Sequence, residues 1–260
     1  MKSFTGVLFL LACLGCATQQ TQLILRVKDV VLSPGPEVGL EHPNGELVIA
    51  VPTRTMQEML LAHIRISRTA NVQSELYIAD GDEPNAFVGQ DATGRNVMGI
   101  NIGMVRLVGN DADAYAALIG HEAAHLAKDH GASRRQRSNT LDLIGTIAGA
   151  SLGMAGVPGG GLISGIAVDA IGSTYSRDQE READALGVEY MLANQYDPQG
   201  AIRLNELLLK THSGISIPFL SSHPSSDERI ENLRALIEAK KSQDNLKSAV
   251  LPPENVAAKE

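Results

Sequence analysis

Cysteine is nearly absent from this sequence, and that absence restricts the chemistry of any active site. The 260 residues contain two cysteines, Cys13 and Cys16, and both lie near the N-terminus. A disulfide framework, a cysteine-ligated zinc ion, an iron–sulfur cluster and a cysteine nucleophile are therefore excluded from the rest of the chain. Any metal site there must be built from histidine, aspartate and glutamate.

Aromatic residues and positive charge are also scarce. Aromatic residues make up 3% of the chain and tryptophan is missing, so we expect no stacking surface for single-stranded nucleic acid. The 22 lysines and arginines are outnumbered by 30 aspartates and glutamates, which gives a formal charge of −8. Because binding to nucleic acid depends on clustered positive charge, we expect no nucleic-acid partner. The length and the 43% hydrophobic content suit one sizeable domain.

The N-terminus has the pattern of an export signal. A positive start at Lys2 is followed by an apolar run over 4–14 that is too short to span a bilayer. The run ends in glycine and Cys16, and a polar stretch follows, which resembles a bacterial lipobox. We therefore predict a lipoprotein signal peptide over 1–15 and acylation of Cys16, which would anchor the chain to a membrane surface. Cys13 is a competing acylation site, and an ordinary secretory signal with an incidental cysteine is the plainer alternative.

Beyond the signal, the sequence predicts one main domain. Residues 16–53 are predicted as a tether and an irregular segment with one or two short strands, because apolar runs alternate there with proline and glycine. Residues 54–241 carry the periodic segments, and residues 242–260 are predicted as a mobile tail. Within the domain we expect helices over 54–68, 111–130, 176–194, from 197 onward and over 225–241, and strands over 75–79, 85–88 and 96–108.

The strongest chemical signal is His121-Glu122-Ala123-Ala124-His125, an HExxH motif within the helix predicted over 111–130. Residues four apart lie on one helical face, so both imidazoles can reach one metal ion while Glu122 lies beside it. This arrangement suits a metal-bound water that a carboxylate deprotonates. Small residues around the motif favour a buried helix over the plainer alternative of two surface histidines with a glutamate.

A zinc site of this kind needs a third protein ligand. One class of HExxH proteins places a histidine ten residues after the first, but that position is Gly131, so this class is excluded. The other class uses a glutamate on a later helix, and the segment from Ser176 to Asp184 supplies Glu180. Asp184 lies one helical turn further on, where its carboxylate can accept the free ring N–H of a ligand histidine.

Three other ionisable residues receive plainer interpretations. His130 is one residue away from the required spacing, so we interpret it as structural or solvated. Glu182 is expected to point away from the site into solvent. His63 is a lone histidine in a helical pattern and is expected to be packed or solvated.

Taken together, these motifs resemble the zinc endopeptidases of the HtpX and CAAX prenyl protease type, which include a soluble periplasmic branch of the BepA and LoiP type. HExxH is followed about fifty residues later by SRxxExxAD, and the match is complete at Ser176, Arg177, Glu180, Ala183 and Asp184. An Asn-Ala-Phe segment at 85–87 matches as well, and so does a His-Pro segment at His223 together with Glu228 and Arg229. No long apolar span outside the signal is visible, so the resemblance is to the soluble branch. It implies a predominantly helical α+β, zincin-like metallopeptidase domain over 54–241, with a small sheet beside the HExxH helix.

The resemblance also implies a role for each residue. One Zn²⁺ per chain would be held by His121, His125 and Glu180, with the fourth position left for water. Glu122 would take a proton from that water and pass it to the leaving amine. His223 would either donate to the developing oxyanion or fill the fourth position and keep the enzyme latent; a packing histidine before a proline is the plain alternative.

Two further segments are candidates for contact with substrate. Asn85, Ala86 and Phe87 are expected to form an edge strand over the cleft, where an extended peptide could pair with it through main-chain hydrogen bonds. Asn85 would hold the substrate backbone, although it could equally be a plain turn residue. The glycine-rich stretch 141–172 breaks into pieces too short to cross a bilayer, and we predict a mobile apolar lid over the site, or a contact with lipid or partner proteins.

The sequence therefore predicts a zinc-dependent endopeptidase of the bacterial cell envelope that cleaves misfolded or unassembled proteins. The alternatives are a zinc-stabilised, proteolytically latent chaperone or assembly factor for outer-membrane proteins, and a degenerate fold that binds no metal. Expected partners are extended polypeptides, the outer-membrane assembly machinery and a membrane surface reached through Cys16. Ala17 after that cysteine favours, by resemblance to lipoprotein sorting, a periplasmic position at the outer membrane.

Overall fold

The computed structural model describes residues 22–32, 35–91, 93–131, 174–212 and 217–250. The predicted signal peptide with Cys13 and Cys16, and the predicted lid over 141–172, lie outside the described residues. Within these ranges, every helix is too short or too polar to cross a membrane.

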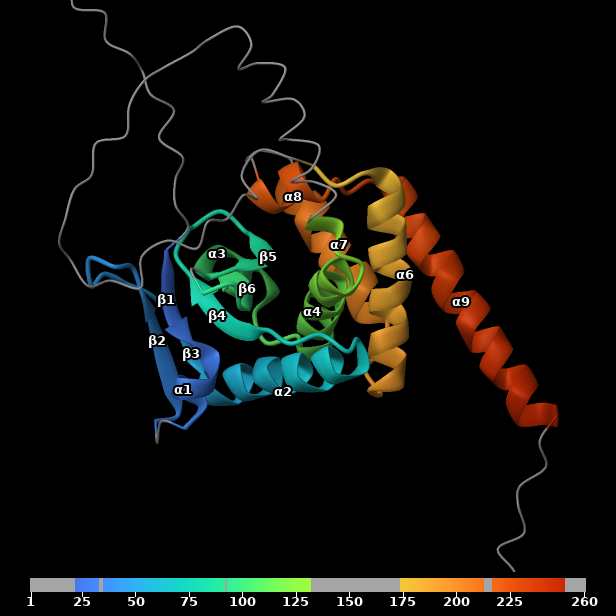
Figure 1. Cartoon of the computed structure of the whole chain (residues 1–260), viewed down its shortest axis with the longest axis horizontal. Coiled ribbons are helices and arrows are strands. Elements are labelled where there is room, and N and C mark those ends of the chain that lie inside the picture. Colours follow the sequence, from blue (N-terminus) through green and yellow to red (C-terminus); the bar gives the residue numbers. More distant parts are fainter. Residues whose placement is uncertain (1–21, 33–34, 92, 132–173, 213–216, 251–260) are drawn as a thin grey trace, which may run out of the picture.

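A helical body carries a small sheet on one side, with α4 running through the middle of the molecule (Figure 1). The strands are β1 (Leu23–Arg26), β2 (Glu37–Glu41), β3 (Leu47–Pro52), β4 (Glu75–Ala79), β5 (Ala86–Gln90) and β6 (Asn96–Asn101). The helices are α1 (Val27–Val31), α2 (Thr53–Thr69), α3 (Ile102–Val108), α4 (Ala112–Ala127), α6 (Arg177–Ala193), α7 (Gln199–His212), α8 (Pro218–Ser222) and α9 (Asp227–Val250). The predicted α+β class with mostly helical content is confirmed.

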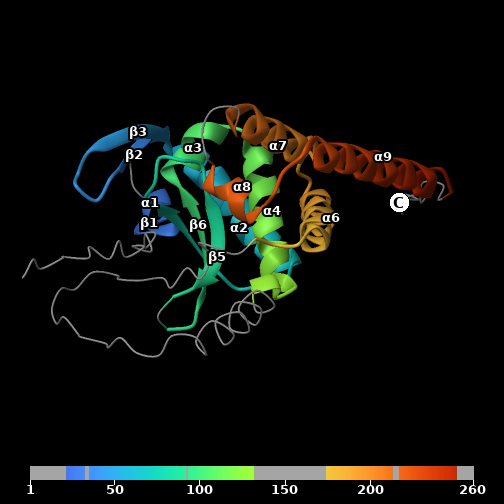
Figure 2. The same ribbon diagram turned by 90° about the horizontal axis from the view of Figure 1, so that it is seen from above.

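The main sheet has four strands in the order β1-β4-β6-β5. Strands β4 and β6 pair in parallel at its centre, and the other two pairings are antiparallel. Strand β5 is therefore an edge strand, and it contacts α4 (Figure 2). Strands β2 and β3 form a separate two-stranded ribbon.

Helix α4 is the central helix of the body and is buried from Ala114 to His125. It contacts α2, α6 and α7 as well as β5 (Figure 2). Its small residues let α6 approach closely, because a Cβ added at Gly120 would lie 3.1 Å from the carbonyl oxygen of Gly187 in α6. This backbone-to-backbone contact holds α6 against the helix that carries the HExxH motif.

The N-terminal segment is more ordered than the sequence predicts. Residues 23–52 contain three strands and a short helix, whereas we expected an irregular segment with one or two strands. Leu25 of β1 pairs with Ile78 of β4, so the segment belongs to the main sheet. The proline and glycine between β2 and β3 mark a hairpin, where Gly45 has a φ of 85°. Long-range pairing of this kind leaves little trace in local periodicity.

Three other boundaries differ from the predictions. The stretch 96–108 was predicted as strand, but it turns into α3 after Asn101, whose side chain accepts a hydrogen bond from the Met104 N–H. A continuous apolar run does not distinguish a buried helix from a strand. Helix α4 ends at Ala127, before the predicted stop at Gly131. Helix α9 continues to Val250, so part of the predicted tail is helical.

Candidate metal centre

Four side chains from three parts of the chain converge at one point. His121 and His125 lie on α4, Glu180 lies in the first turn of α6, and His223 directly follows α8. One ligand atom from each lies within 4.8 Å of the others, and all four residues are buried. The capping box predicted for α6 is present, with Ser176 and Gln179 bonded reciprocally, and it sets the start of the helix that presents Glu180.

The spacing of these atoms suits a tetrahedral ion. The Nε2 atoms of His121 and His125 are 3.0 Å apart, and the Glu180 oxygens lie 3.5 Å and 3.4 Å from them. Zinc bonds of about 2.0–2.1 Å in a tetrahedron separate ligand atoms by about 3.3 Å. Two imidazoles and a carboxylate are ligands that Zn²⁺ commonly takes in proteins, so the residues fit this ion.

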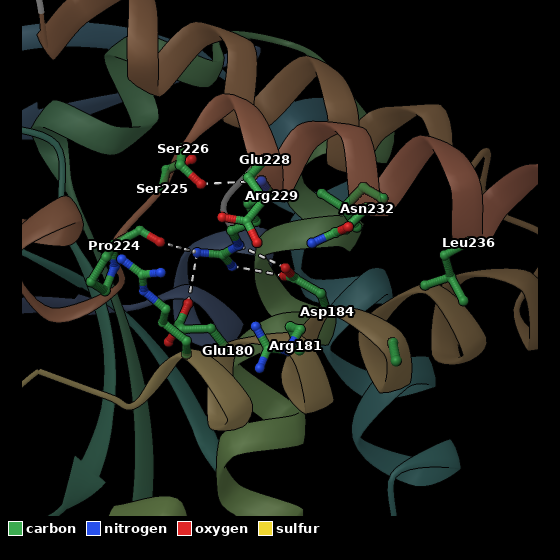
Figure 3. A pocket seen from close by; sticks show the side chains of 13 residues that line it. Glu180, Arg181, Asp184, Pro224, Ser225, Ser226, Glu228, Arg229, Asn232 and Leu236 are labelled. Atoms are coloured by element: carbon green, nitrogen blue, oxygen red, sulfur yellow. Dashed lines mark hydrogen bonds and ion pairs between the residues drawn. The ribbon is translucent and has the colours of Figure 1, made fainter.

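The orientation of His121 depends on an ion-pair network between α6 and α9. Its Nδ1–H donates to Oδ1 of Asp184 over 3.0 Å, which leaves the Nε2 lone pair facing the other ligands. Arg229 of α9 donates two hydrogen bonds of 2.6 Å and 2.7 Å to Asp184, and its Nη1 lies 2.6 Å from Glu180 Oε2 (Figure 3). Arg229 thus links a candidate ligand to the residue that orients another.

Arg229 also lines a pocket between α6 and α9 (Figure 3). Glu180 and Asp184 form part of the same wall, and Leu236 lies further along α9. None of the three histidines lines this pocket. It is therefore a different space from the point where the four candidate ligand atoms meet.

The surroundings of His125 differ from those of His121. Tyr175 stacks on its ring with centroids 3.8 Å apart and planes inclined by 29°. Its Nδ1 lies 2.9 Å from Nδ1 of His130, which is buried. Of the two predicted interpretations, solvated is wrong because His130 is buried, and its ring lies directly against a candidate ligand. Glu182 is partly exposed, as predicted, yet it contacts both His130 and Lys128.

The buried charges favour a cation where the imidazoles meet. Burial lowers the pKa of His121, but the Glu180 carboxylate, helped by Asp184, outweighs that effect and raises it to about 9. Burial opposes the charged form of Glu180 as well, yet the neighbouring histidines hold the pKa of its carboxyl well below its usual range. Burial lowers the pKa of His125 well below its ordinary value, so this imidazole is neutral and able to act as a ligand.

Glu122 lies beside the ligand cluster and is 1% exposed. Neither of its oxygens has a hydrogen-bond partner among the described residues, and its Oε1 lies 3.4 Å from His223 Nε2. Burying a carboxylate without partners is costly, which points to a functional group that completes its environment. A water at the metal would supply that partner.

His223 is held among the ligand atoms. Its Nδ1 lies 3.2 Å from His121 Nε2 and 3.1 Å from Glu180 Oε1. Its backbone N–H donates to the Phe219 carbonyl over 2.8 Å, and the Phe219 ring stacks on the imidazole with centroids 4.5 Å apart.

The predicted substrate segment lies at the sheet edge. Ala86 and Phe87 belong to edge strand β5, but their side chains are buried. The Phe87 ring covers Gly99 of β6, where an added Cβ would approach it to 2.2 Å. The backbone N–H of Asn85 donates to the Asn101 side chain over 2.9 Å. Contact with substrate at this segment would therefore involve the backbone of β5 more than these side chains.

Arg229 and Tyr175 are not among the site residues predicted from the sequence, although Arg229 lies in the matched segment downstream of His223. A signal for Arg229 exists, because Ile230, Leu233 and Ile237 mark the buried face of α9 and place an arginine at its border. No local pattern marks Tyr175. His63, expected to be packed or solvated, is packed: it is buried with its Nε2 2.9 Å from Ser74 Oγ.

Comparison with known proteins agrees with this geometry. The model of peptidase family M48 matches residues 51–237. The mitochondrial metalloendopeptidase OMA1 of Schizosaccharomyces pombe is 29% identical over 201 residues, which covers 76% of this chain and 57% of that protein. The metalloprotease YcaL of Escherichia coli is 29% identical over 117 residues, 45% of this chain and 46% of the relative.

The beta-barrel assembly-enhancing protease of Yersinia pestis is 27% identical over 192 residues, 69% of this chain and 37% of the relative. The matched regions thus span about half the length of these relatives or less. Because the family model covers most of the sequence, the chain belongs to peptidase family M48.

Proposed function

We propose that this protein is a zinc-dependent endopeptidase. One observation carries the proposal: His121, His125 and Glu180 present ligand atoms to one point, beside a buried Glu122 carboxylate without hydrogen-bond partners among the described residues. The names of relatives such as the metalloendopeptidase OMA1 and the metalloprotease YcaL support the same activity.

Each residue of the site has its own role in hydrolysis. A zinc ion held by His121, His125 and Glu180 would lower the pKa of a water to roughly 7 and would polarise the peptide carbonyl. Glu122 accepts the proton of the attacking water and then delivers it to the leaving nitrogen. Asp184 keeps the His121 ring in the tautomer that leaves Nε2 free.

His223 fits the role of a latency ligand better than that of an oxyanion donor. Its Nδ1 lies as close to His121 and Glu180 as these two lie to each other. In this position it would fill the fourth corner of a tetrahedral ion. The water that faces Glu122, and the substrate, would then enter only after His223 moves away. A donor to the oxyanion would instead be expected outside the ligand cluster.

The substrate we propose is an extended or unfolded polypeptide. Among the described residues, strand β5 has no partner on its outer side, and it lies beside the HExxH helix. Its backbone can add one more antiparallel strand. Folded proteins rarely offer such a segment, which favours misfolded or unassembled chains.

The envelope location remains part of the proposal. The name of two relatives, the beta-barrel assembly-enhancing proteases of Yersinia pestis and Escherichia coli, supports a role near outer-membrane assembly. The lipobox-like sequence at Cys16 supports a lipid-anchored, periplasmic protein. Intact-mass analysis of the membrane-extracted protein, expressed in a bacterium with an outer membrane, tests the anchor. A chain that retains residues 1–15, or that carries no acyl mass, would contradict it.

The second candidate function is a latent chaperone or assembly factor, and the position of His223 favours it. The Glu122→Gln variant separates the two functions. We expect it to retain zinc and to lose casein cleavage by roughly 100- to 10,000-fold in kcat/KM. The exposed Glu189→Gln variant on α6 serves as the control and should cleave normally.

Wild-type cleavage rates in Glu122→Gln would refute the proposed mechanism. A chain that binds zinc and unfolded protein without cleaving it, even as His223→Ala, would support the chaperone instead. If His223 is a latency ligand, His223→Ala raises cleavage; if it donates to the oxyanion, the same variant loses roughly 100- to 1,000-fold.

A further inference from the structure

His130 is held against the metal centre by an unusual turn. Helix α4 ends at Ala127, and Asp129 then adopts a left-handed φ of 49°. Had the helix continued, a residue five positions after His125 would have faced away from it. The turn instead returns the chain, so that His130 is 4% exposed and its Nδ1 lies 2.9 Å from His125 Nδ1.

We propose that His130 is a positioning residue that fixes the tautomer of His125 and thereby strengthens metal binding. Two facing imidazole nitrogens form a hydrogen bond only when one carries the proton and the other a lone pair. His125 needs its Nε2 lone pair for the metal, so its proton lies on Nδ1. His130 Nδ1 must therefore be the acceptor.

Glu182 fixes the opposite end of His130. Its Oε2 lies 3.3 Å from His130 Nε2, and a carboxylate only accepts, so the proton of His130 lies on Nε2. The hydrogen bonds then run in one direction, from His125 to His130 and from His130 to Glu182. Lys128 Nζ lies 2.6 Å from the other Glu182 oxygen and holds that carboxylate in place.

A packing role alone would not require this arrangement. Tyr175 already stacks on His125 and fixes the plane of its ring. The additional contribution of His130 is the position of one proton, which decides whether His125 offers a lone pair or an N–H to the metal.

The experiment compares two variants of the full chain in a zinc competition assay with a chromophoric chelator. His130→Leu fills the space but accepts no hydrogen bond, and we expect zinc affinity to fall about 10- to 100-fold. His130→Asn places an amide oxygen close to the position of Nδ1, and we expect affinity within about threefold of wild type because the acceptor is kept. His212→Leu, at an exposed histidine on α7, is the matched control and should not change affinity.

Circular dichroism of each zinc-loaded variant shows whether it is folded. If His130→Leu does not fold, NMR of the wild type and His130→Asn decides: we expect an exchange-protected Nδ1–H on His125 in both. An Nε2–H tautomer of His125 in wild type would overturn the inference.

Equal zinc affinity in wild type and His130→Leu, or equal losses in both His130 variants, would also overturn it. The inference rests on the proposed zinc site but not on peptidase activity. A wild-type chain that binds no zinc would instead refute the metal site itself.

Discussion

The two histidines of the HExxH motif lie one turn apart on the same helix, yet they are oriented by different means. His121 donates to the part-buried Asp184, which accepts hydrogen bonds from Arg229 of α9. His125 faces His130, which follows α4 almost directly, and the Tyr175 ring stacks on it. One half of the centre depends on charges brought together from distant parts of the chain, whereas in the other half two rings contact the candidate ligand.

This difference predicts unequal sensitivity to mutation. Removing one member of a buried ion-pair network leaves the remaining charges without compensation, whereas removing a neutral acceptor costs one hydrogen bond. We therefore expect the half around His121 to contribute more to stability, and the half around His125 to affect metal binding with little effect on folding.

The largest effect is expected for Arg229→Met. The variant leaves the buried Glu180 and the part-buried Asp184 without the arginine that pairs with both, which should lower the free energy of unfolding of the zinc-free chain by about 3–5 kcal/mol. Urea unfolding measures this loss. Arg234→Met, on the same helix as Arg229, removes an exposed ion pair with Glu206 of α7 and should cost less than about 1 kcal/mol. Equal losses in the two variants would remove the basis for the comparison.

Metal removal tests both halves together, since one ion would join α4 to α6. Zinc at 1,000 times its Kd should raise the free energy of unfolding by about 4 kcal/mol over the chelated protein. Thermal unfolding with and without a chelator measures the shift. In His121→Ala the shift should largely disappear, and an unchanged shift in that variant would mean that zinc acts elsewhere on the chain.

His63 shows what burial does to a histidine that has neither a charged partner nor a candidate metal among the residues that the structure describes. Burial lowers its pKa to about 4 from an ordinary value of 6.5. The unfolded chain therefore binds more protons between these pH values, and stability falls as pH drops from 6.5 to 4. A pKa shift of this size changes the free energy of unfolding by about 3 kcal/mol.

His63→Gln keeps a polar atom for Ser74 but does not titrate, so its stability should fall less across this pH range. Urea unfolding of both proteins at several pH values measures the difference. The exposed His212→Gln should follow wild type, and parallel curves for wild type and His63→Gln would contradict the prediction.

The smallest effect is expected at the contact that the two halves share. An alanine Cβ at Gly187 would lie 3.2 Å from the backbone nitrogen of His121 and 3.3 Å from the Gly120 carbonyl carbon. Separating α4 from α6 by a few tenths of an ångström should cost about 1–3 kcal/mol, partly offset by about 1 kcal/mol of helix propensity. Chemical denaturation of Gly187→Ala measures the net loss. Gly120→Ala probes the same contact from the other helix and should lower stability to a similar extent. A clear gain in stability in either variant would contradict close packing of α4 against α6.

Local patterns in the sequence determined much of the centre. Residues four apart on a helix must share a face, which places His121 beside His125 and Glu180 near Asp184. The start of α6 followed from its capping box, because Ser176 and Gln179 bond within one turn. These predictions succeed because each depends on geometry that spans only a few residues.

Tertiary structure decided the rest. Arg229 meets Asp184 only after α9 packs beside α6, and His130 returns to His125 only through the left-handed turn at Asp129. Strand β1 likewise became part of the sheet through pairing with β4, far along the chain. Periodicity shows which residues can share a face, but the closure of the chain in space decides which faces meet. The sequence alone therefore identified the candidate ligands, and only the folded chain showed what orients them.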